Sequence, residues 1–383
     1  MHGTESPEIT PEDLIRTVES GSPIRVLDVR APEALAGGRI DIVPSDRFIN
    51  IRGSEILARG DAIGQTLKQN GPIAVVCGRG NSSKQIATHL NEIGYQATSI
   101  RGGMAAWADA LVARTLRPPS GFDHLIEFDR VAKGSLAYLV GAGGEAMIID
   151  PPRKARLLLD TARDLGLKVV AVADTHAHAD YISGGPGLSK ALRVPYYLHS
   201  ADAILPYDGS PAKIEYAAIA DGQTLPIGGA TIRVEHTPGH TLGSVTYHLG
   251  ADAALTGDFI FIASVGRPDL GGKAEEWTPM LWQSLERARA SWPKGVQVFP
   301  AHYASDSERE PDRSVGRALS AIAATNAAFQ IKQQGEFVSW VMQKIGKSPD
   351  AYRKIKAVNL GLIQVWDMEA QELDSGRNEC ALG

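Results

Sequence analysis

The sequence predicts an α/β protein with two domains and a helical C-terminal extension. A length of 383 residues exceeds that of one ordinary domain. Short apolar runs alternate with amphipathic helical patterns, as in layered α/β folds. Pro118 and Pro119 interrupt these patterns. We therefore expect domains at 1–113 and 122–313, a linker at 114–121 and the helical extension at 314–383.

Composition narrows the classes of partner and compartment. The chain is 43% hydrophobic and 22% charged, which is typical of globular proteins with sizeable cores. A net charge of −5 without a basic stripe argues against nucleic acid as a partner. The polar start predicts no signal peptide, and the sequence has no apolar run of about 18 residues to span a membrane. Cys77 and Cys380 lie far apart, which predicts a reducing, cytoplasmic location without a disulfide framework.

The first domain has a strand–loop–helix pattern around Cys77. The apolar run 73–76 predicts a buried strand, and Ile86 and Leu90 follow the loop at helical spacing. Backbone N–H groups of such a loop and the helix N-terminus favour an anion, and Arg79 adds positive charge. These effects should lower the pKa of the Cys77 thiol and make it reactive. The alternative is a buried, inert cysteine.

Three segments of this domain resemble the rhodanese sulfurtransferase family: Asp28-Val29-Arg30, the loop Cys77 to Ser83, and Arg101 to Trp107. The resemblance implies a rhodanese-like α/β domain in which Cys77 carries sulfane sulfur as a persulfide. It also implies that Arg79 and Gly80 bind the substrate, with thiosulfate, sulfite and thiols as partners.

The second domain contains four strand-like runs that each end in possible metal ligands. The runs are 169–173, 231–236, 253–256 and 296–299. The candidate ligands that follow them are His176, His178, Asp180, His240, Asp258 and His302. A sheet fixes the backbone at strand ends, and imidazole with carboxylate suits zinc, iron or manganese. Each segment alone could be a polar turn or a surface histidine, but four together predict a metal centre.

The order His-x-His-x-Asp, Pro-Gly-His, Gly-Asp, Pro-Ala-His resembles the metallo-β-lactamase superfamily across roughly 120 to 310, and within it the glyoxalase II and persulfide dioxygenase branch. The resemblance implies an αββα fold with the metal at one edge of its two sheets. It assigns His176, His240 and Asp258 as the metal ligands. His178, Asp180 and His302 would contact and orient these ligands or act as additional ligands. Arg267 would bind a substrate carboxylate, and an arginine in a surface turn is an equal alternative.

The residue after Asp180 argues for a single metal ion. Dinuclear relatives usually have a histidine there, whereas this chain has Tyr181. A phenol with a pKa of about 10 is a poor ligand near neutral pH. Two histidines and one carboxylate with open positions suit non-heme Fe(II) and O₂, so we expect one Fe(II) per chain, with zinc less favoured.

The two resemblances together imply a persulfide dioxygenase that oxidises glutathione persulfide, or a similar small persulfide, with O₂ to sulfite. Cys77 would transfer sulfane sulfur in a separate reaction. The pairing of the domains supports this function by association only. Two alternatives remain open: a zinc-dependent thioester hydrolase of the glyoxalase II type, and a non-catalytic persulfide carrier or sensor.

The C-terminal extension should be helical at 315–329 and 337–345, with a third helix opening at Ser348-Pro349. We expect it to cover the second domain or to join a subunit interface in a homo-oligomer. Cys380 is expected to be mobile and without a role, and Tyr303 has no assigned role.

Overall fold

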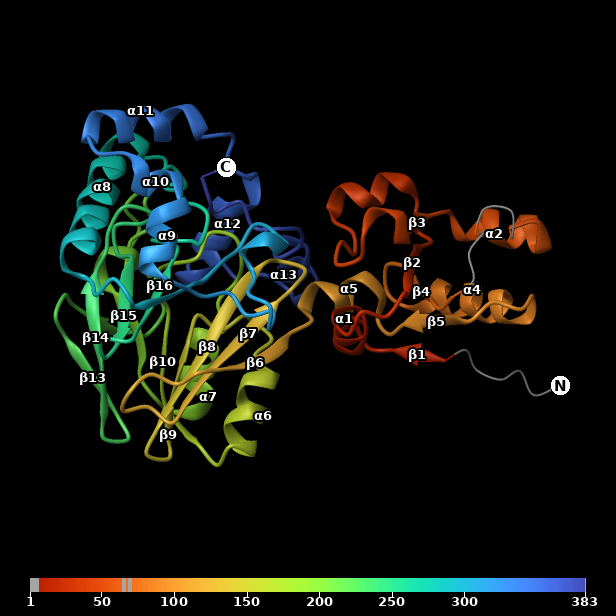
Figure 1. The fold of residues 1–383 in the computed structure, drawn as a ribbon, viewed down its shortest axis with the longest axis horizontal. Coiled ribbons are helices and arrows are strands. Elements are labelled where there is room, and N and C mark those ends of the chain that lie inside the picture. The colour runs from red at the N-terminus through yellow and green to blue at the C-terminus, as the bar shows by residue number, and fades with distance from the viewer. Residues whose placement is uncertain (1–6, 64–66, 68–70, 383) are drawn as a thin grey trace. The chain divides into compact units, whose positions relative to one another are not determined.

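The computed structural model describes residues 7–63, 67 and 71–382, which divide into two compact units (Figure 1). The first unit runs to Val112 and takes in Arg130–Lys133 and Ser375–Arg377. The second comprises the rest of the described chain. The predicted linker 114–121 begins inside a strand, since Val112–Leu116 forms β6.

The first unit is built on a parallel sheet of five described strands in the order β1-β5-β4-β2-β3. The strands are β1 (Glu8–Ile9), β2 (Arg25–Asp28), β3 (Phe48–Asn50), β4 (Ile73–Val76) and β5 (Ala97–Ile100). The α-helices with described bounds are α1 (Pro11–Glu19), α2 (Gly53–Arg59), α4 (Asn81–Glu92) and α5 (Gly103–Asp109). Alternate residues of β4 enter separate apolar clusters, Ile73 and Val75 in one and Ala74 and Val76 in the other. The sheet is therefore buried on both faces, as a continuous apolar run predicts.

The second unit contains two mixed sheets. The seven-stranded sheet has the order β12-β11-β10-β9-β8-β7-β6, and the six-stranded sheet has the order β13 to β18 in sequence. The first sheet consists of β6, β7 (His124–Arg130), β8 (Ser135–Ala142), β9 (Glu145–Ile149), β10 (Lys168–Ala173), β11 (Tyr196–His199) and β12 (Ala217–Ile219). The second consists of β13 (Thr224–Ile227), β14 (Ala230–His236), β15 (Val245–Leu249), β16 (Ala253–Gly257), β17 (Gln297–Pro300) and β18 (Arg317–Ala318). The predicted strands of this domain agree with these bounds to within two residues.

Helices lie outside the two sheets. They are α6 (Arg156–Asp164), α7 (Gly185–Leu192), α8 (Ala274–Ser291), α9 (Leu319–Thr325), α10 (Ala327–Gln330), α11 (Gln334–Lys344), α12 (Asp350–Asn359) and α13 (Asp367–Leu373). Figure 1 shows α6 and α7 beside the first sheet and α8 beside the second, with α11 next to α8. The main core contains Tyr138 and Ile149 from one sheet, Val234 and Tyr247 from the other, and Leu281 from α8. The predicted αββα architecture with C-terminal helices is confirmed.

The prediction of one helix at 315–329 is wrong. Arg317–Ala318 instead forms β18, which pairs with β17, and the helix that follows breaks at Asn326 between α9 and α10. Asn326 donates hydrogen bonds from Nδ2 to the carbonyls of Phe261 (3.1 Å) and Ser264 (2.8 Å). These hydrogen bonds to residues distant in sequence hold Asn326 outside the helix, although the spacing of apolar residues predicts a continuous helix there. The helices α11 and α12 fall where the sequence predicts them, whereas α13 was not predicted.

The expectation that Cys380 is mobile is also wrong, because its side chain is fully buried. Its segment lies antiparallel to the chain around Gly266, which forms an isolated bridge with Ala381. The N–H of Arg267 donates to the Cys380 carbonyl (2.8 Å), and the N–H of Leu382 donates to the Val265 carbonyl (3.0 Å). The C-terminal extension therefore covers the second unit. Among the described residues, none of the helices is long and apolar enough to cross a membrane.

Candidate metal centre and sulfur-transfer site

The predicted metal ligands lie in the loops that follow the strands. His176, His178 and Asp180 follow β10, His240 lies between β14 and β15, Asp258 follows β16, and His302 follows β17. All six side chains are at most 1% exposed. Burial removes these ionisable side chains from water, which costs free energy unless another group pairs with them. They therefore need partners within the fold.

His176, His240 and Asp258 converge on one point, since their ligand atoms lie within 4.8 Å of one another. Asp258 Oδ2 lies 3.6 Å from His176 Nε2 and 3.4 Å from His240 Nε2. None of these three atoms has a hydrogen-bond partner among the described residues. Ligands of one ion at about 2 Å are spaced roughly 3–4 Å apart, so the arrangement fits a metal ion.

The other ring nitrogen of each histidine fixes its tautomer. His240 Nδ1 faces the Arg267 carbonyl (2.8 Å), so Nδ1 must carry the proton. His176 Nδ1 faces Thr175 Oγ1 (3.0 Å), whose own proton goes to Asp150 Oδ2 (2.8 Å). Both Nε2 atoms are thus left with lone pairs, as metal binding requires. Burial also lowers the pKa of each of these imidazoles, which keeps them neutral.

His302 lies between two carboxylates. Its Nδ1 is 2.6 Å from Asp258 Oδ1, and its Nε2 is 3.0 Å from Asp180 Oδ2. Burial lowers the pKa of His302, but Asp180 and Asp258 outweigh burial and raise it to about 10. His302 can therefore hold Asp258 in place by donating a proton to Oδ1, which leaves Oδ2 for an ion.

His178 and Tyr181 of the first loop contact Asp150 and one another. His178 Nε2 lies 3.0 Å from Asp150 Oδ1 and 2.9 Å from the hydroxyl of Tyr181. That hydroxyl also donates to the Asp150 carbonyl (3.2 Å), so Tyr181 does not act as a ligand. Tyr303 donates to Asp129 Oδ1 (3.0 Å) and likewise points to another partner.

Two aspartates that the sequence reasoning missed hold the ligand loops. Asp202 Oδ2 accepts hydrogen bonds from the Ala177 N–H and the Thr241 hydroxyl, and its Oδ1 accepts one from the Gly243 N–H, each at 2.7 Å. It thereby joins the loop of His176 to the loop that follows His240. Asp150 accepts the N–H of Thr175 (2.6 Å). Asp150 follows β9 and could have been found by its position after a strand, whereas the sequence around Asp202 has no such signal.

The guanidinium of Arg267 is already occupied. It pairs with Asp269 through Nε (3.0 Å) and Nη2 (2.7 Å), and Nη2 also donates to the Gly346 carbonyl (2.7 Å). Its Nη1 lies 3.4 Å from the Glu379 carbonyl, and the residue is 5% exposed. These contacts favour a structural role over substrate binding, which stays a prediction for Arg267.

Cys77 lies in the loop between β4 and α4. Its Sγ accepts the N–H of Gly80 (3.1 Å) and lies 3.3 Å from Ser83 Oγ. Burial raises the pKa of the thiol, but hydrogen bonds from Ser83 and from the backbone of Arg79 and Gly80 outweigh burial and leave the pKa below its usual value. Arg79 itself is exposed at the loop. The predicted direction of the pKa change is confirmed, but hydrogen bonds and not the charge of Arg79 cause it. That Cys77 is the reactive residue stays a prediction.

Gly103 lets α5 pack directly on this loop. Its φ of 60° is in the left-handed region, and a Cβ there would lie 2.3 Å from the Cys77 carbonyl oxygen and 2.8 Å from the Arg79 nitrogen. The N–H of Met104 donates to that Cys77 carbonyl (2.8 Å). The glycine-rich motif after β5 thus fixes the backbone of the reactive loop.

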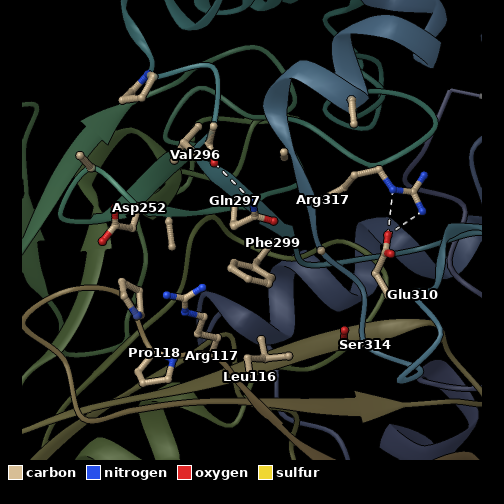
Figure 2. Close-up of a pocket in the computed structure, with 18 of the residues that line it drawn as sticks. Leu116, Arg117, Pro118, Asp252, Val296, Gln297, Phe299, Glu310, Ser314 and Arg317 are labelled. Carbon is tan, nitrogen blue, oxygen red and sulfur yellow. Dashed lines mark hydrogen bonds and ion pairs between the residues drawn. The ribbon is translucent and has the colours of Figure 1, made fainter.

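The cavities differ in their relation to these sites. Figure 2 shows a cavity of about 950 Å³ around Phe299, in which Arg317 pairs with Glu310 (2.8 Å). None of the candidate metal ligands lines it. A smaller cavity of about 150 Å³ is lined by Ala177, Thr241 and Lys356, next to the loops that carry His176 and His240. Its position makes it the better candidate for substrate approach.

Comparisons with known proteins agree with both halves of this description. Residues 130–311 match the metallo-beta-lactamase superfamily, and residues 10–110 match the rhodanese-like domain family. A probable polyketide biosynthesis zinc-dependent hydrolase, BaeB, from Bacillus velezensis is 30% identical over 200 residues, which cover 52% of this chain and 82% of the relative. The chain belongs to the metallo-β-lactamase superfamily.

Two other proteins are similar to part of this chain. A hydroxyacylglutathione hydrolase from Acidiphilium cryptum is 32% identical, over 49% of this chain and 73% of the relative. The structure of ETHE1 from Myxococcus xanthus is similar in fold, with a TM-score of 0.53, 23% identity and coverage of 66% of this chain and 99% of that one. Together with the buried His and Asp groups, the matches indicate a metal-dependent enzyme that carries a rhodanese domain.

Proposed function

We propose that this protein is an iron-dependent persulfide dioxygenase whose rhodanese-like domain transfers sulfane sulfur through Cys77. The substrate would be glutathione persulfide or a similar low-molecular-weight persulfide, RSSH. One RSSH, one O₂ and one water would give RSH, sulfite and two protons. The sulfane sulfur loses four electrons, and O₂ accepts them.

The observation that carries the proposal is the buried set of two histidines and one carboxylate. His176, His240 and Asp258 present three atoms without hydrogen-bond partners among the described residues. This donor set suits non-heme iron with open positions. Fe(II) in this site would supply the redox chemistry that joins O₂ to sulfur.

The chain's own residues would orient the ligands and position the substrate. His302 would hold a proton next to Asp258 Oδ1 (2.6 Å). Lys356 donates from Nζ to the Ala177 carbonyl (2.9 Å) and lines the small cavity beside the ligand loops. Burial lowers the pKa of Lys356, but its N–H donors suit an anionic group of a persulfide.

Sulfur transfer would use the thiolate of Cys77. Attack on the outer sulfur of thiosulfate forms a persulfide on Cys77 and releases sulfite, and a thiol can then accept the sulfur. The reverse direction uses the same atoms. The N–H of Gly80 at 3.1 Å from Sγ supports a negative charge there in either direction.

The deciding experiment measures oxygen uptake by full-length protein that has been loaded with iron under anaerobic conditions and offered glutathione persulfide. We expect one sulfite for each O₂ consumed and about one iron per chain. Protein loaded with Zn²⁺ alone should consume no O₂, because zinc has no redox chemistry. Absence of O₂ uptake by iron-loaded protein would contradict the proposal.

A zinc-dependent thioester hydrolase is the second candidate. Both sequence relatives named above carry hydrolase names, and one of them is a hydroxyacylglutathione hydrolase. In that case zinc-loaded protein should cleave a glutathione thioester, and iron-loaded protein should consume no O₂ when offered glutathione persulfide. The same two metal-loaded samples therefore distinguish the two functions.

A further inference from the structure

The cavity of about 150 Å³ beside the ligand loops has a mostly apolar wall. Its larger apolar side chains are Ile204, Pro206, Leu242, Trp277 and Leu360. We propose that this cavity selects a persulfide with a short, apolar carrier group, such as an alkyl persulfide, over glutathione persulfide. Glutathione persulfide would still react, with its peptide part outside the cavity. The proposal rests on the persulfide dioxygenase function and concerns the substrate of that same site.

The volume of the cavity argues against a peptide carrier. Sites that enclose drug-sized ligands have volumes of about 300–1,000 Å³, and the lower end is already about twice the volume found here. A water molecule takes about 30 Å³ of liquid volume, so the cavity has room for about five groups of that size. Two sulfur atoms and a chain of two carbons meet this limit, whereas the tripeptide glutathione exceeds it.

The polar groups of the wall suit one anionic group. Among the described residues that line the cavity, Lys356 is the one basic side chain. Its Nζ donates to the Ala177 carbonyl (2.9 Å), which leaves two of the three N–H donors of an ammonium group. The buried Nε1 of Trp277 has no hydrogen-bond partner among the described residues. These donors can serve the terminal sulfur of a persulfide.

The wall offers little to the charges of glutathione, which has two carboxylates and an ammonium group. Both oxygens of Asp202 already accept hydrogen bonds from the ligand loops. Arg267, which was predicted to bind a substrate carboxylate, does not line the cavity, and its guanidinium pairs with Asp269. A charge that enters an apolar cavity without a partner costs free energy. A carrier without charges avoids that cost.

Ile204 lies at the entrance of the cavity. Its side chain is 48% exposed, whereas the wall residues Trp277 and Leu360 are 2% and 1% exposed. A carrier group that extends out of the cavity would therefore contact Ile204 first. This position makes Ile204 a specificity-determining residue that can be shortened without opening the core.

The test compares ethyl persulfide with glutathione persulfide in O₂ uptake by iron-loaded, full-length protein. The kcat/KM for ethyl persulfide should be at least about tenfold higher, since even one methylene in a hydrophobic pocket changes kcat/KM by about 10–200-fold. Ile204→Ala should widen the entrance and lower this ratio by at least about fourfold, the equivalent of one CH₂ group. Leu165→Ala is the matched control, because Leu165 is 39% exposed and does not line the cavity. It should keep the wild-type ratio.

Binding of the product thiols gives a second measurement that needs no turnover. Zinc-loaded protein should bind ethanethiol at least about tenfold more tightly than glutathione in a calorimetric titration. A kcat/KM for glutathione persulfide equal to or above that for ethyl persulfide would overturn the proposal, and so would an unchanged ratio in Ile204→Ala. Absence of O₂ uptake with both persulfides would instead contradict the proposed function. The two thiol affinities would then decide whether the cavity selects a small apolar group.

Discussion

The Cys77 site and the metal centre are assembled in opposite ways. The Cys77 loop is one continuous segment in which Gly80 and Ser83 contact the sulfur. The metal centre instead collects side chains from the ends of separate strands, from β10 to β17. A site formed by one contiguous segment can be predicted from the residues next to one another in the sequence. A site formed by residues distant in sequence can be described in full only from the folded structure.

The largest expected effect is a complete separation of the two activities. Asp258→Ala should abolish O₂ uptake and lower the iron content, because Asp258 is the one carboxylate among the three predicted iron ligands. Its sulfurtransferase activity should remain. Cys77→Ser should lose sulfurtransferase activity, because serine cannot hold a transferable sulfur. It should still consume O₂ when preformed glutathione persulfide is supplied. With thiosulfate and glutathione as the only sulfur source, Cys77→Ser should consume no O₂. The measurements are O₂ uptake, thiosulfate sulfurtransfer and iron content of each variant.

Loss of O₂ uptake with preformed persulfide in a folded, iron-loaded Cys77→Ser protein would contradict the separation. The two sites would then work as one. His302→Ala serves as a control of intermediate effect, since His302 is predicted to contact the ligand Asp258 and not the iron itself. It should retain iron and lose only part of the O₂ uptake.

A smaller effect should follow from Asp202→Asn. An amide NH₂ would replace one of the two oxygens that accept from Ala177, Thr241 and Gly243, so a donor would face a donor. We expect iron to bind about 10–100-fold more weakly and the unfolding free energy to fall by about 1–3 kcal/mol. Competition with a chelator measures the first and denaturant unfolding the second.

The exposed Asp208 gives the matched control, and Asp208→Asn should change neither value by a comparable amount. Equal iron affinity in Asp202→Asn and wild type would mean that the two ligand loops hold their positions without this bridge. The metal centre would then be less dependent on distant residues than its structure indicates.

These differences explain how much could be predicted from sequence. Strands such as β4 and β10 are continuous apolar runs, and residues that follow such strands, such as His176 and Asp258, were predictable for that reason. Asp202 and Cys380 were not, because their partners are distant in sequence and neither residue lies in a recognisable motif. The break at Asn326 has the same cause, since its side chain bonds to carbonyls some 60 residues away.

The smallest expected effect tests the local site through its pH dependence. Ser83 lowers the pKa of Cys77 by hydrogen bonding, and burial acts in the opposite direction. In Ser83→Ala the pKa of the thiol should rise, so the midpoint of the sulfurtransfer rate should move to higher pH. Below the midpoint the rate should fall by up to about tenfold, which corresponds to the loss of one hydrogen bond to a charged group. Above it, where the thiol is ionised in both proteins, the rates should converge.

Ser82→Ala is the control for this shift, since Ser82 is the exposed neighbour of the buried Ser83 and should leave the pH profile unchanged. Sulfurtransfer by wild type, Ser82→Ala and Ser83→Ala, measured across the pH range with thiosulfate saturating, gives the comparison. A parallel fall at every pH in Ser83→Ala would show that Ser83 positions the loop instead of stabilising the thiolate, because a change in protonation alone disappears once the thiol is fully ionised. Ser83 also lies 2.9 Å from Ser99 Oγ, so the converging profile is the result that identifies an electrostatic role.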